Sequence, residues 1–436
     1  FLFLGTQLFA QATPSEKMED FMNNKAEGFN TAYDQRDLKT FNTLLSEYLS
    51  NYENLGAEEK GPYTYILNNI YYNLTCIYAL LNDKKMAIMT FSKAIDAGYN
   101  DYRHVQSDTD LESIRNEKEF LELNRKLKST GDYLDILKRA HQYNPADSRP
   151  IPAFSYQQSD HTNLTALREG FKLDSIAGQG SDVLKILNLL HWVHDLVPHN
   201  GMHGNPEVKN AMSMLEVCKK ENRGLNCRGL SLVLNECYLA LGIKSRIVTC
   251  LPKDSLKIDQ DCHVINSVYS ETLNKWLWID PTFEAYVMNE KGELLSIEEV
   301  RERLVTGQSL ILNPDANWNN QSEQTKEEYL ENYMAKNLYM LECPVSSEYN
   351  MESAAAGKTY TYVRLLPLDY FAQDPHKEEE KRDKGNTTWV TYKTNNAGVF
   401  WEDNLKKRIS AEQKDGSENS VIVMSNIRHS SVNGNS

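Results

Sequence analysis

One helix followed by three β-rich stretches is the feature that most constrains the fold of this chain. Leu230 to Leu241 are good helix formers, with Asn226 as a candidate N-cap and Gly242 as a left-handed helix stop. Three stretches rich in β-branched and apolar residues then predict strands: Ser245 to Cys250, His263 to Tyr269 and Lys275 to Ile279.

Cys227 would lie in the first turn of this helix. Unpaired backbone N–H groups and the helix dipole favour a thiolate there, and the same N–H groups can hold an oxyanion. The alternative interpretation is a small buried residue at a helix start, because buried cysteines are common.

His263 and Asp280 are predicted to meet across the last two strands. If these strands form a hairpin centred near Glu271 and Thr272, the antiparallel register places His263 directly opposite Asp280, within side-chain reach. A thiol, an imidazole and a carboxylate are the groups that nucleophilic acyl transfer requires.

These segments resemble a known family. The block Asn226-Cys-Arg-Gly-Leu230, with Leu241-Gly-Ile-Lys-Ser-Arg-Ile-Val248, resembles the nucleophile segment of the transglutaminase-like superfamily. His263-Val-Ile-Asn-Ser-Val-Tyr269 and Lys275-Trp-Leu-Trp-Ile-Asp-Pro-Thr282 resemble its His and Asp segments, and the likeness covers roughly residues 130–345.

The resemblance implies a papain-like α+β core, with the cysteine-bearing helix packed on an antiparallel sheet. It also implies that Cys227 is the nucleophile, His263 its base and acid, and Asp280 the group that orients the imidazole. Relatives include acyl transferases, proteases, amidases and inactive members, so the reaction stays open.

The segment upstream of Cys227 is expected to line the same cleft. Asp182 to Leu196 predicts an apolar helix, and Pro198 to Gly204 a turn. In this superfamily an upstream residue often supplies a second oxyanion donor. The candidates for the oxyanion site or cleft wall are Trp192, Asn226 and His199, with core packing as the alternative for Trp192.

Metal and disulfide chemistry are the rival interpretations. Four histidines gather in this segment, His191, His194, His199 and His203, and the first two could share a helical face. Without an HExxH pattern, a paired CxxC spacing or a DxDxDG loop, we predict no metal and no cofactor. Seven cysteines leave at least one unpaired, and a Cys227–Cys262 disulfide remains an alternative.

Length, charge and the N-terminal residues indicate the number of domains, the kinds of partner and the compartment. A chain of 436 residues predicts two or three domains, and a net charge of -14 argues against a nucleic-acid partner. The apolar run closing on Ala10-Gln-Ala12 is typical of the end of a secretory signal, whose basic start is missing. We therefore expect an exported protein, periplasmic or extracellular, with a buried N-terminal strand as the alternative; no stretch predicts a membrane span.

Residues 13–127 are predicted to be helical. Two amphipathic segments around Asn82 and Asp83 resemble one tetratricopeptide-like hairpin. This small all-α domain would pack against the catalytic domain or, alternatively, bind a protein partner or peptide.

The predicted domains are a signal remnant (1–12), the helical domain (13–127), the transglutaminase-like domain (128–345), a β-containing extension (346–403) and a polar tail (404–436). Within them we expect strand character over 333–344, a solvated loop over 376–384 and a strand pair over 389–401.

The sequence thus predicts a secreted cysteine enzyme that acts on amide bonds of peptides or proteins through an acyl-enzyme. Hydrolysis is favoured over cross-linking. The alternative is a catalytically inactive transglutaminase-like binding or adaptor protein, which would keep the fold without the chemistry.

Overall fold

The computed structural model describes residues 12–140, 142–202, 204–253, 261–353, 357–369, 379–384, 387–398 and 400. The predicted signal segment, apart from Ala12, and the polar tail lie outside these residues. The chain divides into two compact units, one ending at Asp132 and one beginning at Tyr133. Among the described residues, no helix combines the length and apolar character needed to cross a bilayer.

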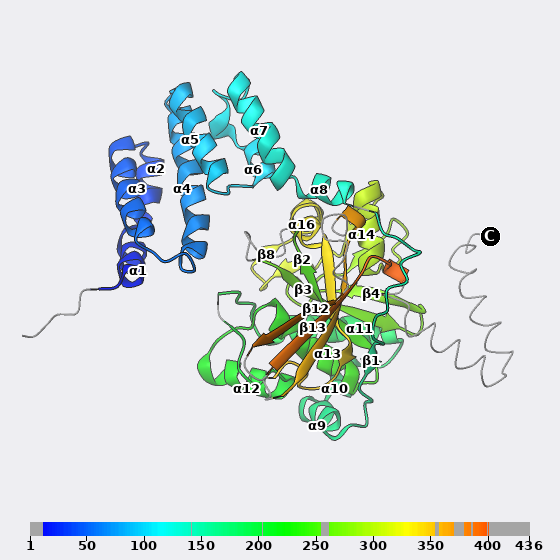
Figure 1. The fold of residues 1–436 in the computed structure, drawn as a ribbon. Helices are drawn as coiled ribbons and strands as arrows, with labels where there is room; N and C mark the ends of the chain where they lie inside the picture. Colours follow the sequence, from blue (N-terminus) through cyan, green and yellow to red (C-terminus); the bar gives the residue numbers. More distant parts are fainter. Residues whose placement is uncertain are drawn as a thin grey trace, which may run out of the picture. The chain divides into compact units, whose positions relative to one another are not determined.

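The first unit is helical in its described part (Figure 1). Its elements are α1 (Pro14–Lys25), α2 (Glu27–Asp34), α3 (Leu38–Glu53), α4 (Lys60–Leu80), α5 (Lys84–Asp96), α6 (Tyr102–Ser107), η1 (Thr109–Leu111) and α7 (Lys118–Gly131). Asn82 (φ 58°) makes the turn between α4 and α5, and Asp83 caps α5 by accepting from the N–H of Met86. The helical prediction for this unit is confirmed; its tetratricopeptide likeness stays a prediction. The domain boundary predicted after residue 127 falls inside α7.

The second unit has α+β architecture, as predicted. Its helices are α8 (Tyr133–Arg139), α9 (Thr162–Phe171), α10 (Leu173–Ala177), α11 (Asp182–Leu196), α12 (Ala211–Glu221), α13 (Cys227–Ala240), α14 (Ile297–Thr306), α15 (Lys326–Glu328), the π-helix η2 (Tyr329–Met334) and α16 (Ala335–Asn337).

The described residues of the second unit form a seven-stranded sheet. Its order is β12 (Glu379–Lys384), β13 (Thr387–Thr394), β11 (Thr359–Leu365), β9 (Met340–Pro344), β2 (Ser245–Leu251), β3 (His263–Ser270) and β4 (Lys275–Ile279). All neighbours are antiparallel except β11 and β13, so the sheet is mixed where a purely antiparallel one was expected. Three two-stranded pairs accompany it: β1 (Ser155–Tyr156) with β10 (Ser346–Ser347), β5 (Val287–Met288) with β6 (Ile311–Leu312), and β7 (Asn317–Trp318) with β8 (Ser322–Glu323).

Two expectations for the C-terminal part were wrong. Residues 379–384, expected to be part of a solvated loop, form the edge strand β12, and charged residues of both signs are typical of an edge strand. Residues 389–401, expected to be a strand pair, contribute one strand, β13, because its partners are β12 and β11 and the chain turns helical at Ala397.

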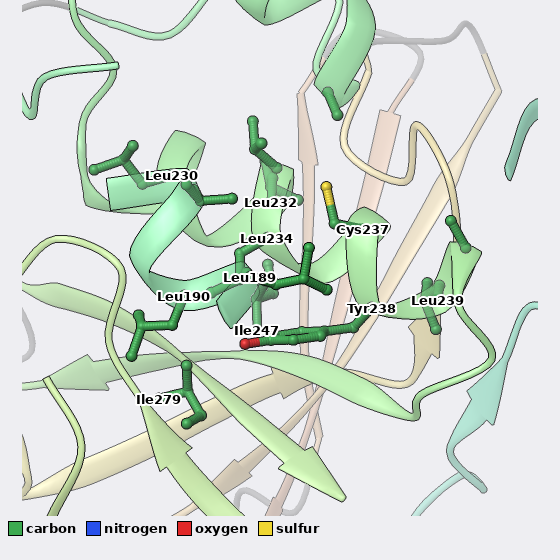
Figure 2. Close-up of a cluster of buried hydrophobic side chains, with 14 of the residues drawn as sticks. Leu189, Leu190, Leu230, Leu232, Leu234, Cys237, Tyr238, Leu239, Ile247 and Ile279 are labelled. Atoms are coloured by element: carbon green, nitrogen blue, oxygen red, sulfur yellow. The ribbon is translucent and has the colours of Figure 1, made fainter. Parts of the chain in front are cut away.

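Helix α13 is the centre of the main hydrophobic core. Its side chains Leu230, Leu232, Leu234, Tyr238 and Leu239 pack with α11 and with the sheet (Figure 2). The hydroxyl of Tyr238 donates to the carbonyl of Ile186 on α11 at 2.9 Å. Burying each leucine contributes about 1.5–3 kcal/mol, so this packing fixes the axis of α13 and with it the place of Cys227.

The hairpin between β3 and β4 differs from the predicted register. Ser270 pairs with Lys275, so the turn holds four residues, and Asn274 adopts the left-handed conformation (φ 51°). Asp182 stabilises this wider turn by accepting from the Ser270 hydroxyl at 3.0 Å and from the N–H of Thr272 at 3.1 Å.

The wider turn shifts the register by two residues. His263 therefore lies diagonal to Asp280 across the hairpin and not directly opposite it. A one-residue slip would have turned the two side chains to opposite faces, but an even shift keeps them on the same face.

Candidate active site

The start of α13 is held by paired asparagines. Asn226 is the N-cap, and its Oδ1 accepts from the N–H of Gly229 at 3.1 Å. The Asn205 amide donates to the same Oδ1 at 2.6 Å, and its own Oδ1 accepts from the N–H of Asn226 at 3.1 Å. A Cβ on Gly229 would lie 2.5 Å from Asn205 Oδ1, so glycine permits this close approach. Asn226 thus serves as a cap and positions Cys227 at the first helical residue.

A short backbone bridge brings His199 to the same place. The N–H of Leu225 donates to the carbonyl of Pro198 at 3.1 Å, and the N–H of Asn200 donates to the carbonyl of Leu225 at 2.7 Å. A Cβ on Gly224 would lie 2.3 Å from the Pro198 carbonyl oxygen. The segment that follows α11 and the segment that precedes α13 are therefore in direct contact, on both sides of His199.

His263 and Asp280 form a buried ion pair. Nε2 of His263 lies 2.6 Å from Oδ2 of Asp280, and the two side chains are 1% and 0% exposed. Because a carboxylate only accepts, Nε2 carries the proton and Nδ1 is left to face Cys227. Asp280 is fixed in turn by the Tyr329 hydroxyl, which donates to Oδ2 at 2.6 Å, and by the N–H of Thr282, which donates to Oδ1 at 2.9 Å.

The electrostatics favour an ionised thiol. Burial opposes ionisation of Cys227, but hydrogen bonds from the side chains of His199 and His263 outweigh it and lower the pKa to about 6. Burial also opposes charge on His263, but Asp280 outweighs it and raises the pKa of His263 to about 10. Burial without such donors raises the pKa of Cys262 to about 11. At neutral pH the site therefore holds a thiolate beside an imidazolium.

The other predicted site residues lie elsewhere or act differently. Trp192 packs edge-on against Phe171 (5.7 Å between ring centroids) at the hydrophobic core. Nδ1 of His191 lies 2.5 Å from Glu284 Oε1, and the ring of His194 spans the Pro281 carbonyl and Asn317 Oδ1, each at 3.0 Å. These two histidines thus tie α11 to the segment that follows Asp280.

The described residues show neither a cluster of metal ligands nor a disulfide. There, no three His, Cys, Asp or Glu side chains gather as metal ligands do, and His203 lies outside that part of the chain. All seven cysteines are free. The sulfur of partly exposed Cys227 lies 4.0 Å from the main-chain oxygen of Cys262.

The sequence reasoning missed the residues that support the site from behind. Tyr329 and Tyr333 lie on η2, in a stretch partly expected to be a strand, and the Tyr333 hydroxyl is 3.4 Å from Nδ1 of His263. A π-helix is rare, and one of six residues is too short for a sequence pattern to reveal. Trp318 and Asn319 lie on the β7–β8 hairpin, whose turn uses Asn319 and Asn320 in the left-handed conformation (φ 54° each), and asparagine is a common turn residue that could have indicated it.

The geometry agrees with a comparison of the sequence with protein families. Residues 171–281 match the model of the transglutaminase-like superfamily. This transglutaminase-like segment contains Cys227, His199, His263 and Asp280, whereas Trp318, Tyr329 and Tyr333 lie beyond it. The superfamily expectation is therefore supported over about a quarter of the chain.

One curated relative is also similar. Over 106 residues the chain is 26% identical to a chloroplastic protein from Arabidopsis thaliana. The match covers 24% of this chain and 31% of that protein, so it spans less than a third of the relative's length.

Proposed function

We propose that this protein is a cysteine enzyme that cleaves amide bonds of peptides or proteins through an acyl-enzyme on Cys227. One observation carries the proposal. The thiol of Cys227 hydrogen bonds with His263, and His263 is in turn paired with buried Asp280 at 2.6 Å. A cysteine that served packing alone would have no need of a histidine oriented by a buried carboxylate.

The first half of the reaction forms a thioester. The Cys227 thiolate attacks the amide carbonyl, and the imidazolium of His263 gives the proton on Nδ1 to the leaving amine as the C–N bond breaks. Asp280 keeps the other ring proton on Nε2 throughout and stabilises the charged ring.

The second half releases the acid. Neutral His263 accepts a proton from water at Nδ1, the resulting hydroxide attacks the thioester, and the C–S bond breaks to restore the thiolate and imidazolium. We propose hydrolysis as the main outcome because Cys227 is partly exposed and water can reach the thioester.

The developing oxyanion has two sources of donors. The N–H groups at the start of α13 have no carbonyl partner within the helix, and His199 bonds to the Cys227 sulfur from the upstream segment. We propose His199 as the side-chain donor in place of Trp192, whose ring packs against Phe171 and the hydrophobic core.

Export to the periplasm or the cell exterior is also proposed, from the apolar N-terminal run alone. A protein partner for the helical unit is proposed on the same footing, from its tetratricopeptide-like hairpin.

Acylation by an activated ester tests the chemistry without knowledge of the substrate. We expect p-nitrophenyl acetate to add one acetyl group to Cys227, seen by intact mass and peptide mapping, and to release nitrophenolate with a burst. Cys227→Ala should abolish the burst, and Cys262→Ala, which removes the neighbouring thiol, should keep it. Added glycinamide measures how the acyl group divides between water and an amine.

Absence of acetylation on Cys227 in folded protein would contradict the proposal. The inactive binding protein would then be the better interpretation. Acetylation followed by near-complete transfer to glycinamide would contradict hydrolysis alone and indicate a transamidating enzyme.

A further inference from the structure

Two imidazoles bond to the sulfur of Cys227, but they are held by opposite partners. His263 is held at Nε2 by a carboxylate, an acceptor. His199 is held at Nδ1 by the indole N–H of Trp318, a donor, at 3.0 Å. In each ring, the hydrogen-bond partner of one nitrogen determines whether the other nitrogen, which faces the sulfur, carries a proton.

For His199 the choice is forced by the chemistry of indole. The indole N–H donates and has no acceptor, so Nδ1 of His199 must accept with its lone pair. A neutral imidazole has one N–H, and with Nδ1 unprotonated that proton sits on Nε2. Because Nδ1 is occupied by Trp318, Nε2 is the nitrogen that bonds to Cys227.

The β7–β8 hairpin, which contains Trp318, also hydrogen bonds to the backbone of His199. Oδ1 of Asn319 accepts from the N–H of His199 at 2.7 Å, and Nδ2 of Asn319 donates to its carbonyl at 3.0 Å. The rings of His199 and Trp318 meet edge to face with centroids 6.3 Å apart. The backbone of His199 and one edge of its ring are thus both fixed by consecutive residues of β7–β8.

We infer that Trp318 is a positioning residue that locks His199 in the Nε2–H tautomer, so that His199 donates to the anionic sulfur and the oxyanion and cannot take the thiol proton. Nε2 of His263 is held by Asp280, and its Nδ1 can lose and regain a proton beside the same sulfur, so proton transfer belongs to His263 and hydrogen-bond donation to His199. The part played in catalysis rests on the proposed function; the tautomer does not.

The tautomer can be read directly. In protein with ¹⁵N-labelled histidine, long-range ¹⁵N–¹H spectra distinguish a protonated from an unprotonated ring nitrogen, and His199→Gln identifies the His199 signals. We expect Nε2 protonated and Nδ1 unprotonated in the wild type. In Trp318→Phe, and with benzothienylalanine at position 318, which keeps the ring shape and lacks the N–H, we expect a mixture of tautomers.

The consequence for Cys227 is measured by alkylation with iodoacetamide at pH 6. Loss of one oriented donor should slow alkylation about five- to tenfold in Trp318→Phe. In the His199→Gln background the same change should have no further effect, because an amide donor has no tautomers. Trp276→Phe, which alters a buried indole that contacts Tyr156, Tyr269 and Arg246, should leave both readouts unchanged.

A wild-type His199 protonated on Nδ1, or one whose tautomer is the same with benzothienylalanine at position 318, would overturn the inference. Equal slowing by Trp318→Phe in the wild-type and His199→Gln backgrounds would also overturn it, since the indole would then act through structure alone. Failure of the ester assay with the expected tautomer present would count against the proposed function only.

Discussion

His263 Nε2 lies 2.6 Å from Asp280 Oδ2, and both side chains are buried. This contact determines which ring nitrogen faces Cys227, and it sustains the charge on His263. Because Asp280 also accepts from Tyr329 and Thr282, its carboxylate cannot rotate without leaving a buried donor unpaired.

Asp280→Asn should remove most of the activity while the fold persists. The amide can donate to Nε2 and thereby stabilise the wrong tautomer, so we expect acylation to slow roughly 100- to 10,000-fold. Burst kinetics with p-nitrophenyl acetate measure this. A variant with wild-type burst rate would show that Asp280 does not orient His263.

The same pair gives a pH dependence of stability with a definite sign. The pKa of folded His263 is raised to about 10 from 6.5 by Asp280, against the opposing effect of burial. Its contribution to the free energy of unfolding is therefore complete below pH 6.5 and is lost as the pH rises toward 10. Urea unfolding followed by tryptophan fluorescence should show the wild type losing its advantage over His263→Gln across this range; a growing advantage would contradict the pairing.

Tyr329→Phe should weaken the site through Asp280. The lost hydroxyl is a short charge-assisted donor at 2.6 Å, so we expect about 1.5–3 kcal/mol of destabilisation, measured by urea unfolding. Tyr333→Phe is the matched control, since its hydroxyl lies 3.4 Å from Nδ1 of His263 and should cost less. Equal losses would show that the Tyr329 hydroxyl stabilises the fold no more than the Tyr333 hydroxyl, and would contradict a strong charge-assisted bond to Asp280.

Gly224→Ala should separate His199 from Cys227. The added Cβ would meet the Pro198 carbonyl oxygen at 2.3 Å, so the bridge between Pro198 and Leu225 must open. We expect slower alkylation of Cys227 at pH 6 and a lower melting temperature. Gly204→Ala, where a Cβ meets nothing within 4 Å, should behave as the wild type; similar effects in both variants would contradict the steric argument.

The sequence predicted the central elements because their signals are local. The N-cap Asn226, the stop at Gly242 (φ 76°) and the strands β2 to β4 follow from capping chemistry and residue type, and the structure confirms them. The juxtaposition of His263 and Asp280 was also predicted, but from a two-residue turn. Asp182, which is far away in sequence, supports the longer turn, and no local pattern reveals that.

The supporting residues were out of reach for the same reason. Tyr329 contacts Asp280 across 49 positions and Trp318 contacts His199 across 119, so only the tertiary fold brings them together. The parallel pairing of β11 with β13 likewise follows from the place of β12 at the sheet edge beyond β13, whereas each strand alone could pair either way.

The pH dependence of Cys227 alkylation by iodoacetamide, mapped by mass spectrometry, tests the central claim most directly. In the wild type the rate should rise with an inflection near pH 6, because hydrogen bonds with His199 and His263 lower the pKa of the thiol despite its burial. In His263→Ala the inflection should move upward, toward that of an ordinary thiol near about 8.5, because only the His199 donor remains, and Cys262→Ala should match the wild type. A wild-type inflection at or above about 8.5, unchanged by His263→Ala, would contradict an activated cysteine.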